Sequence, residues 1–491
     1  MFLPALFPEL ALFCGALIIL LNDVFFGKNR PEFFRLSYLL AMISCFVALY
    51  FTAQNTFVTG SFFHNMFFIN SFSCFVKFVS IILLIFVIIL SLDFLEKQKS
   101  FSAEFLALIM ISTAGGMFLV SANDFLTFYL SLELQSLPLY LLASINRKSG
   151  KSSESGVKYF VLGSVASGLL LLGISLFYGF SGTTNFDVVA SLYSNNPVPS
   201  AVILGFILIM IAMFFKISAA PFHMWTPDVY EGSSNIVTTF FATVTKFGAT
   251  LVLIRLFLDL SPSWRGMEKI LLLVALASMA VGSFGAIKQT SFKRLLAYSS
   301  VGHVGFAIFG IAALSGDGIK SAVIYMVIYS ILSLGNFGFL NLISGSKTKD
   351  ETATEIGEND DADEKTFNIS SFSGLAKTNP IMAMFLTVLM LSTAGIPPLA
   401  GFFSKFFVIS AGVKSGYFIT STIAVLFSVI SAYYYLRIVK IMYFDKAGDT
   451  QLQFIERYNP KIVVAFAVIF NLAFIVFLKQ FLGMISTMIG F

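Results

Sequence analysis

This chain has few charged residues and almost no cysteine, and both shortages exclude whole classes of protein. Only 12% of its 491 residues are Asp, Glu, Lys or Arg, against about 25% in ordinary soluble domains. Its three cysteines, Cys14, Cys45 and Cys74, stand apart and form no CxxC pattern. The sequence therefore gives no support for an iron–sulfur cluster, a structural zinc site or a disulfide framework.

Signatures of nucleotide and metal chemistry are missing as well. The sequence contains no Walker A motif, no dinucleotide-binding fingerprint after a strand and no HExxH. We accordingly expect this chain to bind no cofactor and no metal. Its net charge of +5 is explained by loops that face anionic lipid, so it does not indicate nucleic acid as a partner.

What the sequence has in abundance is apolar length, since 57% of its residues are hydrophobic. Apolar windows of about 20 residues, the length that crosses a bilayer, recur along the whole chain. We count about fourteen, and their uninterrupted runs lack the period-2 alternation of a membrane β-barrel. The sequence therefore predicts an all-α polytopic membrane protein. No basic residue precedes the first window, so we expect a retained helix there and not a signal peptide.

The distribution of lysine and arginine predicts which side of the membrane each loop faces. Most loop cations follow predicted helices 1, 3, 5, 9, 11 and 13, so these loops should lie on the inner side and both termini on the outer side. The few cations assigned to the other side are Arg265, Lys269, Lys320, Lys414 and Lys479. One inner loop, residues 345–378, is rich in Asp, Glu and Lys, which predicts a solvated insertion.

Four ionisable side chains stand in the middle of apolar helical stretches, and they are Glu133, Lys216, Lys246 and Lys405. A charge left at the centre of a bilayer costs roughly 2.5–3.5 kcal/mol or more, so such residues are usually functional. Moving protons is the use that we expect for them. Lys77 and Arg255 lie nearer the outer ends of their helices, and we expect these two to act as anchors at the membrane interface.

Prolines interrupt two of the predicted helices in comparable ways. Helix 7 contains Pro221 and Pro227, and helix 12 contains Pro397 and Pro398. Proline removes an amide donor and clashes with the preceding turn, so both helices should break at membrane depth. Broken helices in corresponding positions mark ion pathways in transporters. With helix 7 paired to helix 12, helices 4–8 and 9–13 become two five-helix units, and an odd number of spans makes the second unit inverted.

At these residues the chain resembles a known family. Residues 214–232, which read FFKISAAPFHMWTPDVYEG, are similar to a signature of the antiporter-like membrane subunits of respiratory complex I, the proton-translocating NADH:quinone oxidoreductase. Three more segments fit in order: SLELQSLP at 131–138, YSSVGH at 298–303 and GIPPLAGFFSK at 395–405. A lysine at position 405 fits two subunit types of this family and disfavours a third, in which a glutamate is expected. The predicted helix 14 is not followed by a long lateral helix, which disfavours one of the two remaining subunit types.

The resemblance implies a role for each site residue. Glu133 on helix 5 would pair with Lys216 on broken helix 7. Lys246 would be the central proton carrier, and Lys405 would pass the proton towards the outer face, with His303 bridging between them. The expected division of the chain is 1–94 for helices 1–3, 102–258 for the first unit, 268–443 for the second unit and 459–487 for helix 14.

Elementary electrostatics agrees with this assignment. Burial disfavours the charged form of an ionisable group, whereas a nearby opposite charge favours it. Opening the pair of Glu133 and Lys216 would thus promote the release of a proton, which makes the pair a switch. The resemblance also implies that NADH, FMN, iron–sulfur clusters and quinone are bound by partner subunits. Those partners would be the other membrane-arm subunits of complex I, together with lipid, in a bacterial inner membrane.

Each residue also has a structural interpretation. Glu133 and Lys216 could be an ion pair that only fixes packing, and Lys246 could be a packing element. Lys405 could be a cation at a helix end that extends towards the interface. His303 could be a core histidine with satisfied hydrogen bonds, and His223 could merely bind carbonyl groups freed by the first break.

Three rival functions use the same sequence features. They are a Mrp-type cation/proton antiporter subunit, a membrane-arm subunit of a hydrogenase or of a photosynthetic relative, and a passive scaffold. Genes for the peripheral NADH-oxidising and iron–sulfur subunits beside this one would favour complex I over all three.

Overall fold

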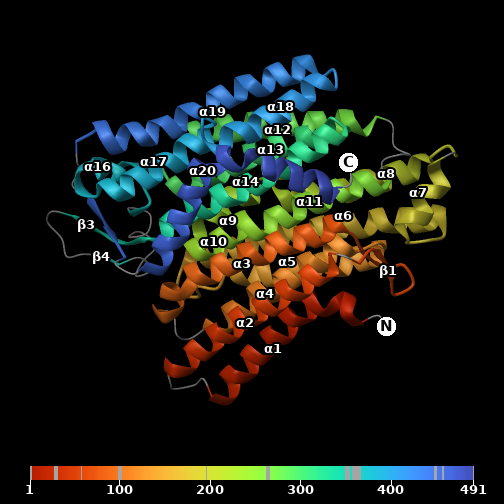
Figure 1. Ribbon diagram of the computed structural model, residues 1–491, viewed down its shortest axis with the longest axis horizontal. Helices are drawn as coiled ribbons and strands as arrows, with labels where there is room; N and C mark the ends of the chain where they lie inside the picture. Colours follow the sequence, from red (N-terminus) through yellow and green to blue (C-terminus); the bar gives the residue numbers. More distant parts are fainter. Residues whose placement is uncertain are drawn as a thin grey trace.

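The computed structural model describes residues 3–26, 31–56, 58–97, 102–194, 196–260, 266–348, 354–355, 366–446, 450–455 and 458–489. This part of the chain forms a bundle of long helices that lie side by side (Figure 1). Thirteen of its helices are long and apolar enough to cross a membrane, and one further apolar helix is shorter. The predicted all-α polytopic membrane fold is confirmed.

The first half of the chain contributes the helices that hold Glu133, Lys216 and Lys246. Its helices before the first break are η1 (Leu3–Leu6), α1 (Phe7–Phe26), α2 (Pro31–Asn55), α3 (Ser71–Lys97), α4 (Ser102–Ser121), α5 (Phe125–Ala143), α6 (Gly150–Ser181) and α7 (Phe186–Ser194). The next are α8 (Ser200–Ile217), α9 (Trp225–Gly232), α10 (Asn235–Phe240), the π-helical turn η4 (Phe241–Thr245) and α11 (Lys246–Leu260). A short hairpin of β1 (Gly60–Phe62) and β2 (Phe67–Ile69) joins α2 to α3.

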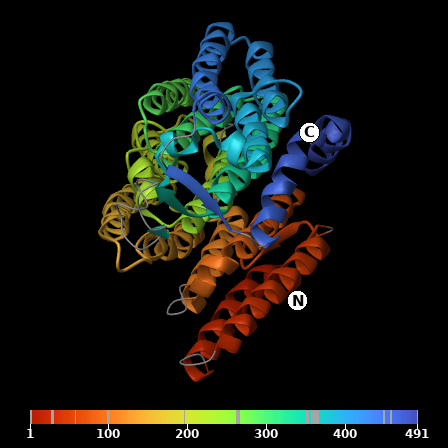
Figure 2. The ribbon, with the colours of Figure 1, turned by 90° about the vertical axis from the view of Figure 1, so that its left-hand side faces the viewer.

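The second half holds His303 and Lys405. Its helices are α12 (Met267–Ile287), α13 (Phe292–Ala312), α14 (Gly316–Asn341), η6 (Ile369–Phe372), α16 (Leu375–Thr378), α17 (Pro380–Ala394), α18 (Ala400–Lys414), α19 (Phe418–Phe444) and α20 (Tyr458–Ile489). A three-stranded sheet, in the order β4 (Thr354–Glu355), β3 (Ile343–Thr348), β5 (Thr450–Phe454), covers one end of the bundle. Figure 2 looks onto that end, with α1 and α2 at the edge of the molecule.

Both predicted helix breaks are present, because α8 is followed by the separate α9 and α17 by the separate α18. At each break the residue after the helix has a left-handed backbone that ends the hydrogen-bond ladder, Ser218 with φ +64° and Gly395 with φ +89°. The α8 and α17 labels stand at opposite ends of the bundle (Figure 1). The first halves of the two broken helices thus enter from opposite ends, as expected for inverted units.

Three spans form the centre of the molecule and are almost completely covered by protein. The buried share is 94% for the α14 span, 89% for the α13 span and 89% for the span from α10 to α11. Because an ionisable group facing lipid is costly, polar side chains are expected on spans of this kind. Lys246, His303 and three of their hydroxyl neighbours, Ser300, Tyr325 and Tyr329, lie on these three spans.

The expectation that Lys77 and Arg255 anchor the chain at the membrane interface is wrong. Lys77 is 1% exposed, and its ammonium lies 2.6 Å from a carboxylate oxygen of Glu9 in α1. Arg255 is 5% exposed, bonds the carbonyl oxygen of Val120 at the end of α4 and lies 3.1 Å from Asp259. Hydropathy does not tell which helix ends the fold covers, and here other elements cover both.

The expectation of a solvated insertion at 345–378 is wrong for a large part of that loop. Strand β3 pairs antiparallel with β5, which lies about 100 residues further along the chain. Phe367, Ile369, Phe372 and Leu375 are buried, because they pack beneath the neighbouring helix ends. The acidic stretches 349–353 and 356–365 lie outside the described residues, as does Arg265.

Candidate functional site

The first break places Lys216 at the end of α8, where the helix stops inside the protein. Beyond Ser218 the chain turns away, and the freed backbone groups find partners nearby. The Trp225 indole donates to the carbonyl oxygen of Phe215 at 2.9 Å, and the Ala220 amide donates to the Ser278 hydroxyl of α12 at 2.8 Å. His223 in this loop is half-buried, and its Nδ1 atom has no hydrogen-bond partner among the described residues. The interpretation of His223 as a partner of carbonyl groups freed by the break stays a prediction.

The Lys216 side chain leaves its own helix and reaches α5. It is 8% exposed, and its ammonium donates to the Ser136 hydroxyl. The rings of Tyr140 and Tyr159 lie 5.5 Å and 5.9 Å from that nitrogen, measured to the ring centroids. A hydroxyl and two ring faces can hold an ammonium group without neutralising it, so the lysine keeps the option of losing its proton.

Glu133 lies on the same helix as Ser136, one turn earlier, and is half-buried. Its carboxylate accepts a hydrogen bond from Ser167 of α6. The described residues contain no ion pair between this carboxylate and the Lys216 ammonium, which donates to Ser136 instead. The predicted approach of these charges in at least one state stays a prediction.

Lys246 lies at the centre of the molecule, directly after the π-helical turn η4. It is 1% exposed, and its ammonium donates to the Ser300 hydroxyl of α13. The ring of Tyr230 lies 5.2 Å from the ammonium. A π-helical turn widens the helix locally and is common at functional sites. No feature that we used in the sequence predicted this turn.

Hydroxyl groups continue from Lys246 towards His303. Tyr329 of α14 donates to the Ser300 hydroxyl at 2.9 Å, and its ring lies 5.2 Å from the His303 ring, measured between centroids. Both nitrogens of His303 have tyrosine partners, with Nδ1 2.6 Å from the Tyr325 hydroxyl and Nε2 3.2 Å from the Tyr435 hydroxyl. The hydrogen bonds of this histidine are thus satisfied, which fits a core residue and a relay residue alike.

The second break holds Lys405 differently. This lysine lies in α18, after the break, and its ammonium turns back to donate to the carbonyl oxygen of Ala394, the last residue of α17, at 2.8 Å. It is 5% exposed, and the Phe306 ring lies 5.6 Å away. The interpretation of Lys405 as a cation that extends to the membrane interface is therefore wrong.

Two further polar contacts hold the second break together. The Gly401 amide donates to the Ser392 hydroxyl at 3.1 Å, and that hydroxyl donates to the side-chain oxygen of Asn471 in α20 at 2.7 Å. Asn471 is completely buried, and its amide group bonds the Ala467 carbonyl at 2.7 Å. The last helix of the chain therefore braces the break next to Lys405.

A small cavity with polar and apolar walls adjoins His303. Its walls include Tyr329, Asn336 and Thr393, and it has about 10 Å³ of volume open to the centre of a water molecule. That volume is close to the least that holds one water. Since no hydrogen bond joins His303 to Lys405 among the described residues, water is the group that can connect them.

An ion-pair cluster ties the first broken helix to the second half of the chain. Asp228 of α9 lies 2.8 Å from Lys158 of α6 and 2.8 Å from Arg294 of α13. Arg294 also lies 2.8 Å from Glu231. Helix α13 carries Ser300 and His303. The cluster therefore connects α9, the helix after the first break, to a helix that carries part of the line of polar groups.

Sequence reasoning missed the hydroxyl partners and Asn471. Ser136 and Ser300 lie within the segments that carry the family resemblance, so their positions were available as a signal. Tyr329 and Tyr435 stand in apolar windows, where a polar side chain needs a partner. In the part of the chain that the structure describes, no group of three or more His, Cys, Asp or Glu residues could hold a metal ion.

Comparisons with known proteins agree on one family. The sequence model of the family described as NADH:quinone oxidoreductase/Mrp antiporter, TM, matches residues 122–431. NADH-quinone oxidoreductase subunit N of Paramagnetospirillum magneticum is 40% identical over 478 residues, which cover 94% of this chain and 94% of that protein. A relative of the same name from Pelagibacter ubique is 42% identical over 394 residues, 79% of each chain.

Solved structures give the same picture. A chain of respiratory complex I from Thermus thermophilus with bound aureothin matches with a TM-score of 0.79 at 25% identity, covering 97% of this chain and 98% of that one. A chain of the Mrp complex from a Dietzia species matches with a TM-score of 0.80 at 19% identity, covering 99% and 96%. The second match shows a likeness of fold alone.

Proposed function

Because this chain belongs to the NADH:quinone oxidoreductase/Mrp antiporter family of transmembrane proteins, we propose a route by which it carries protons. The chain is an antiporter-like subunit of the membrane arm of NADH:quinone oxidoreductase. We propose that it takes part without redox chemistry of its own. The other membrane-arm subunits are its partners, and NADH, FMN, iron–sulfur clusters and quinone are bound by partner subunits.

The observation that carries the proposal is the setting of Lys246. An ionisable group that is 1% exposed donates to a hydroxyl, Ser300, which itself contacts the hydroxyl of Tyr329. A hydroxyl can both accept and donate a hydrogen bond. Ser300 and Tyr329 can therefore pass a proton from Lys246 by reversing the direction of their shared hydrogen bond.

The proton then crosses the cavity beside His303. The walls of that cavity carry the Tyr329 and His303 rings, so one water there completes the step from hydroxyl to imidazole. From His303 the proton passes to Lys405 through further water, since protein groups alone do not join them. Lys405 then releases it towards the far side of the membrane.

The first half of the chain controls when Lys246 is loaded. Glu133 extends from α5, and Lys216 extends from α8 to Ser136 on the same helix as Glu133. Each charge favours the charged form of the other when they approach. Separation of the two leaves Lys216 with only the Ser136 hydroxyl and two rings, which favours release of its proton towards Lys246. The pair is the switch of the proposed route.

Replacement of Glu133 by Gln tests this function. The complex is purified, assembly is measured, and NADH-driven proton uptake is followed in proteoliposomes. Glu133→Gln should lower the number of protons pumped per electron while assembly survives. Asp317→Asn is the matched control, because Asp317 is an exposed carboxylate on α14 that pairs with Lys414 at the surface, and it should pump as the parent does. Equal pumping by both variants would reject the switch.

We also propose that the chain lies in a bacterial inner membrane with both termini on the outer face. The excess of lysine and arginine in alternate loops supports this orientation. A protease site placed within 345–378 should be cut only from the inner side. Cleavage from the outer side would reverse the orientation and the direction of proton release.

A further inference from the structure

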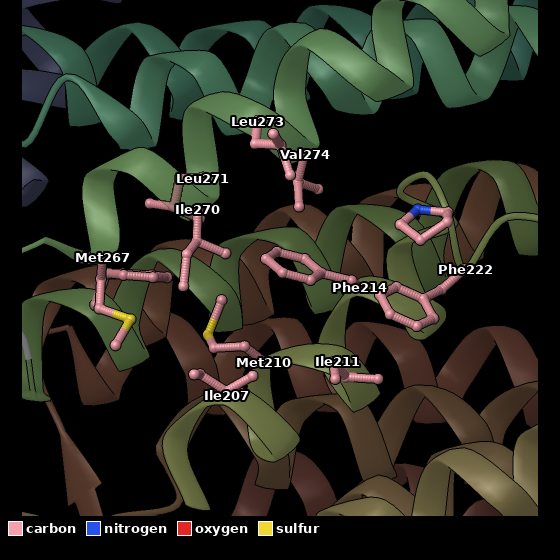
Figure 3. A pocket seen from close by; sticks show the side chains of 12 residues that line it. Ile207, Met210, Ile211, Phe214, Phe222, Met267, Ile270, Leu271, Leu273 and Val274 are labelled. Carbon is pink, nitrogen blue, oxygen red and sulfur yellow. The ribbon is translucent and has the colours of Figure 1, made fainter. Parts of the chain in front are cut away.

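An apolar pocket lies between the two halves of the chain, away from the line of polar groups. One wall is a stripe on α8 formed by Ile207, Met210, Ile211 and Phe214. Their spacing of three and four residues places all four on one face of the helix. Figure 3 shows these side chains pointing into the same space, with Phe222 at one side.

The facing wall belongs to α12. Met267, Ile270, Leu271 and Val274 repeat the same spacing at the start of that helix. Helix α8 packs on α6 and α11, and α12 packs on α13 and α19, so the pocket fills the space between the two stripes. The two halves touch where the Ala220 amide donates to Ser278, one turn beyond Val274. Pro221 and Phe222 of the first break close the deep end there.

Size and polarity define what this pocket can hold. It has about 180 Å³ of volume open to the centre of a water molecule, more than the roughly 150 Å³ of an apolar cavity that stays dry and binds benzene. None of the lining surface is polar, so a polar ligand would lose its hydrogen bonds without compensation. The occupant must therefore be a hydrocarbon.

The position of the pocket identifies which hydrocarbon. It opens sideways, since Leu273 is 71% exposed, and it runs from Met267, the first residue of the span, for about 10 Å along the helix. That depth remains within one leaflet of a hydrocarbon core about 30 Å thick. Lys269 is exposed and lies two residues after the start of the span, whereas the Glu268 carboxylate beside it accepts a hydrogen bond from the Gly266 amide at 2.8 Å.

We propose that this pocket binds one acyl chain of a phospholipid whose phosphate lies near the Lys269 ammonium. The acyl chain lies against Phe214 and the loop of the first break, and it fills the space between the two halves of the protein. A phospholipid thus forms part of the packing around the broken helix that carries Lys216.

Photolabelling of the purified complex tests the proposal. The complex is reconstituted in nanodiscs of phosphatidylethanolamine and phosphatidylglycerol, with part of the phosphatidylglycerol carrying a diazirine in its acyl chain. Adducts are mapped by mass spectrometry after illumination. We expect adducts at Met210 and Ile211 in excess over Leu204 on α8 and Phe284 on α12, which are exposed to the membrane outside the pocket.

Two substitutions separate the pocket from the general lipid surface. Val274→Trp fills the pocket and should lower its adducts by about tenfold or more, while adducts at Leu204 and Phe284 stay unchanged. Ile211→Phe fills less space at a half-buried position and should lower the pocket adducts by a smaller factor. It replaces the tryptophan variant if that variant does not assemble. Phe284→Trp is the control and should leave the pocket adducts at the parental level.

Three outcomes would overturn the proposal. They are equal labelling inside and outside the pocket, retention of pocket adducts in both filled variants, and labelling of a neighbouring subunit whose helix occupies the space. Lys269→Gln should also reduce pocket adducts from the anionic lipid, and unchanged adducts would remove the headgroup contact from the site.

Discussion

The two broken helices hold their lysines in opposite ways. Lys216 stands before its break and sends its ammonium to a neighbouring helix, where Ser136 binds it and Glu133 lies one turn away. Lys405 stands after its break and turns back to the Ala394 carbonyl of its own interrupted helix. A carboxylate can gain or lose a charge, whereas a backbone carbonyl cannot.

In the proposed route this difference gives different tasks to the two halves. The affinity of Lys216 for its proton changes when an acid approaches or withdraws, so the first half can be controlled by charge. Lys405 has a partner of fixed charge, so the geometry of the break and the arrival of water decide whether it takes a proton. In the proposed route the first half therefore acts as the switch and the second as the outlet.

The two breaks also differ in what anchors them. The first is tied to the second half of the chain by the bond between Ala220 and Ser278. The second is tied to the last helix by Ser392 and Asn471. The contacts of the first break therefore reach the second unit, whereas those of the second break reach the last helix, α20.

The largest effect is expected from the residue between the two halves. Lys246→Ala removes the carrier and Lys246→Arg retains a charge that holds its proton too tightly, so both should slow proton transfer through this subunit by on the order of tenfold or more. The measurement is the proton-to-electron ratio in proteoliposomes. Lys414→Ala is the control, because Lys414 is 68% exposed and pairs with Asp317 at the surface. An assembled Lys246→Ala variant that pumps at the parental ratio would make Lys246 a packing element.

A smaller effect is expected from a substitution that loosens the packing of α17 against α18 at the second break. A Cβ atom at Gly401 would lie 1.8 Å from the Ser392 carbonyl oxygen, so Gly401→Ala must push α17 and α18 apart at a cost of about 1–3 kcal/mol or more. The amount of assembled subunit should fall, and the remaining complex should pump less. Gly168→Ala has no atom within 4 Å of the new Cβ and should match the parent. Normal pumping by Gly401→Ala would show that the outlet does not need a tight break.

The brace from the last helix should matter next. Asn471→Leu leaves the Ser392 hydroxyl without its acceptor, and an unsatisfied buried group costs about 1–3 kcal/mol. We expect this subunit to dissociate from the complex at a lower temperature and the complex to pump fewer protons. Asn471→Asp retains an acceptor for Ser392 and should pump better than the leucine variant. If the two variants behave alike, Asn471 does not position the second break.

The mildest effect is expected at His303. His303→Ala enlarges the adjoining cavity, where additional water can replace the imidazole, so pumping should fall less than in either Lys246 variant. His303→Phe fills the same space with an apolar ring and should be the more severe of the two. Proton flux measured at matched rates of NADH oxidation distinguishes them. A reversed order would mean that the histidine only packs.

Much of this architecture could be predicted from the sequence, because it follows from local composition. Apolar windows predicted the spans, prolines predicted both breaks, and Lys246 stood out as a charge in an apolar run. The ion pair of Glu9 and Lys77 could not be predicted, since hydropathy does not say which helices become neighbours. The prediction of a solvated segment near Phe372 was wrong, because the acidic composition of the loop concealed an apolar pattern.

The partners of the site residues needed the three-dimensional structure. Ser300 lies far from Lys246 along the chain, and only the crossing of α11 and α13 brings them together. The carbonyl of Ala394 is a backbone group that no residue pattern reveals. The π-helical turn before Lys246 likewise left no signal in the features that we used.

The central claim is that the switch and the outlet belong to one route in series, and a double variant tests it most directly. Glu133→Gln in the first half and His303→Ala in the second should each reduce pumping in part. If the two steps lie on one route, the double variant should pump at the rate of the slower single variant, because only one step limits the flow. Reductions that multiply, measured as protons pumped per electron in the assembled complex, would contradict a single route through Lys246.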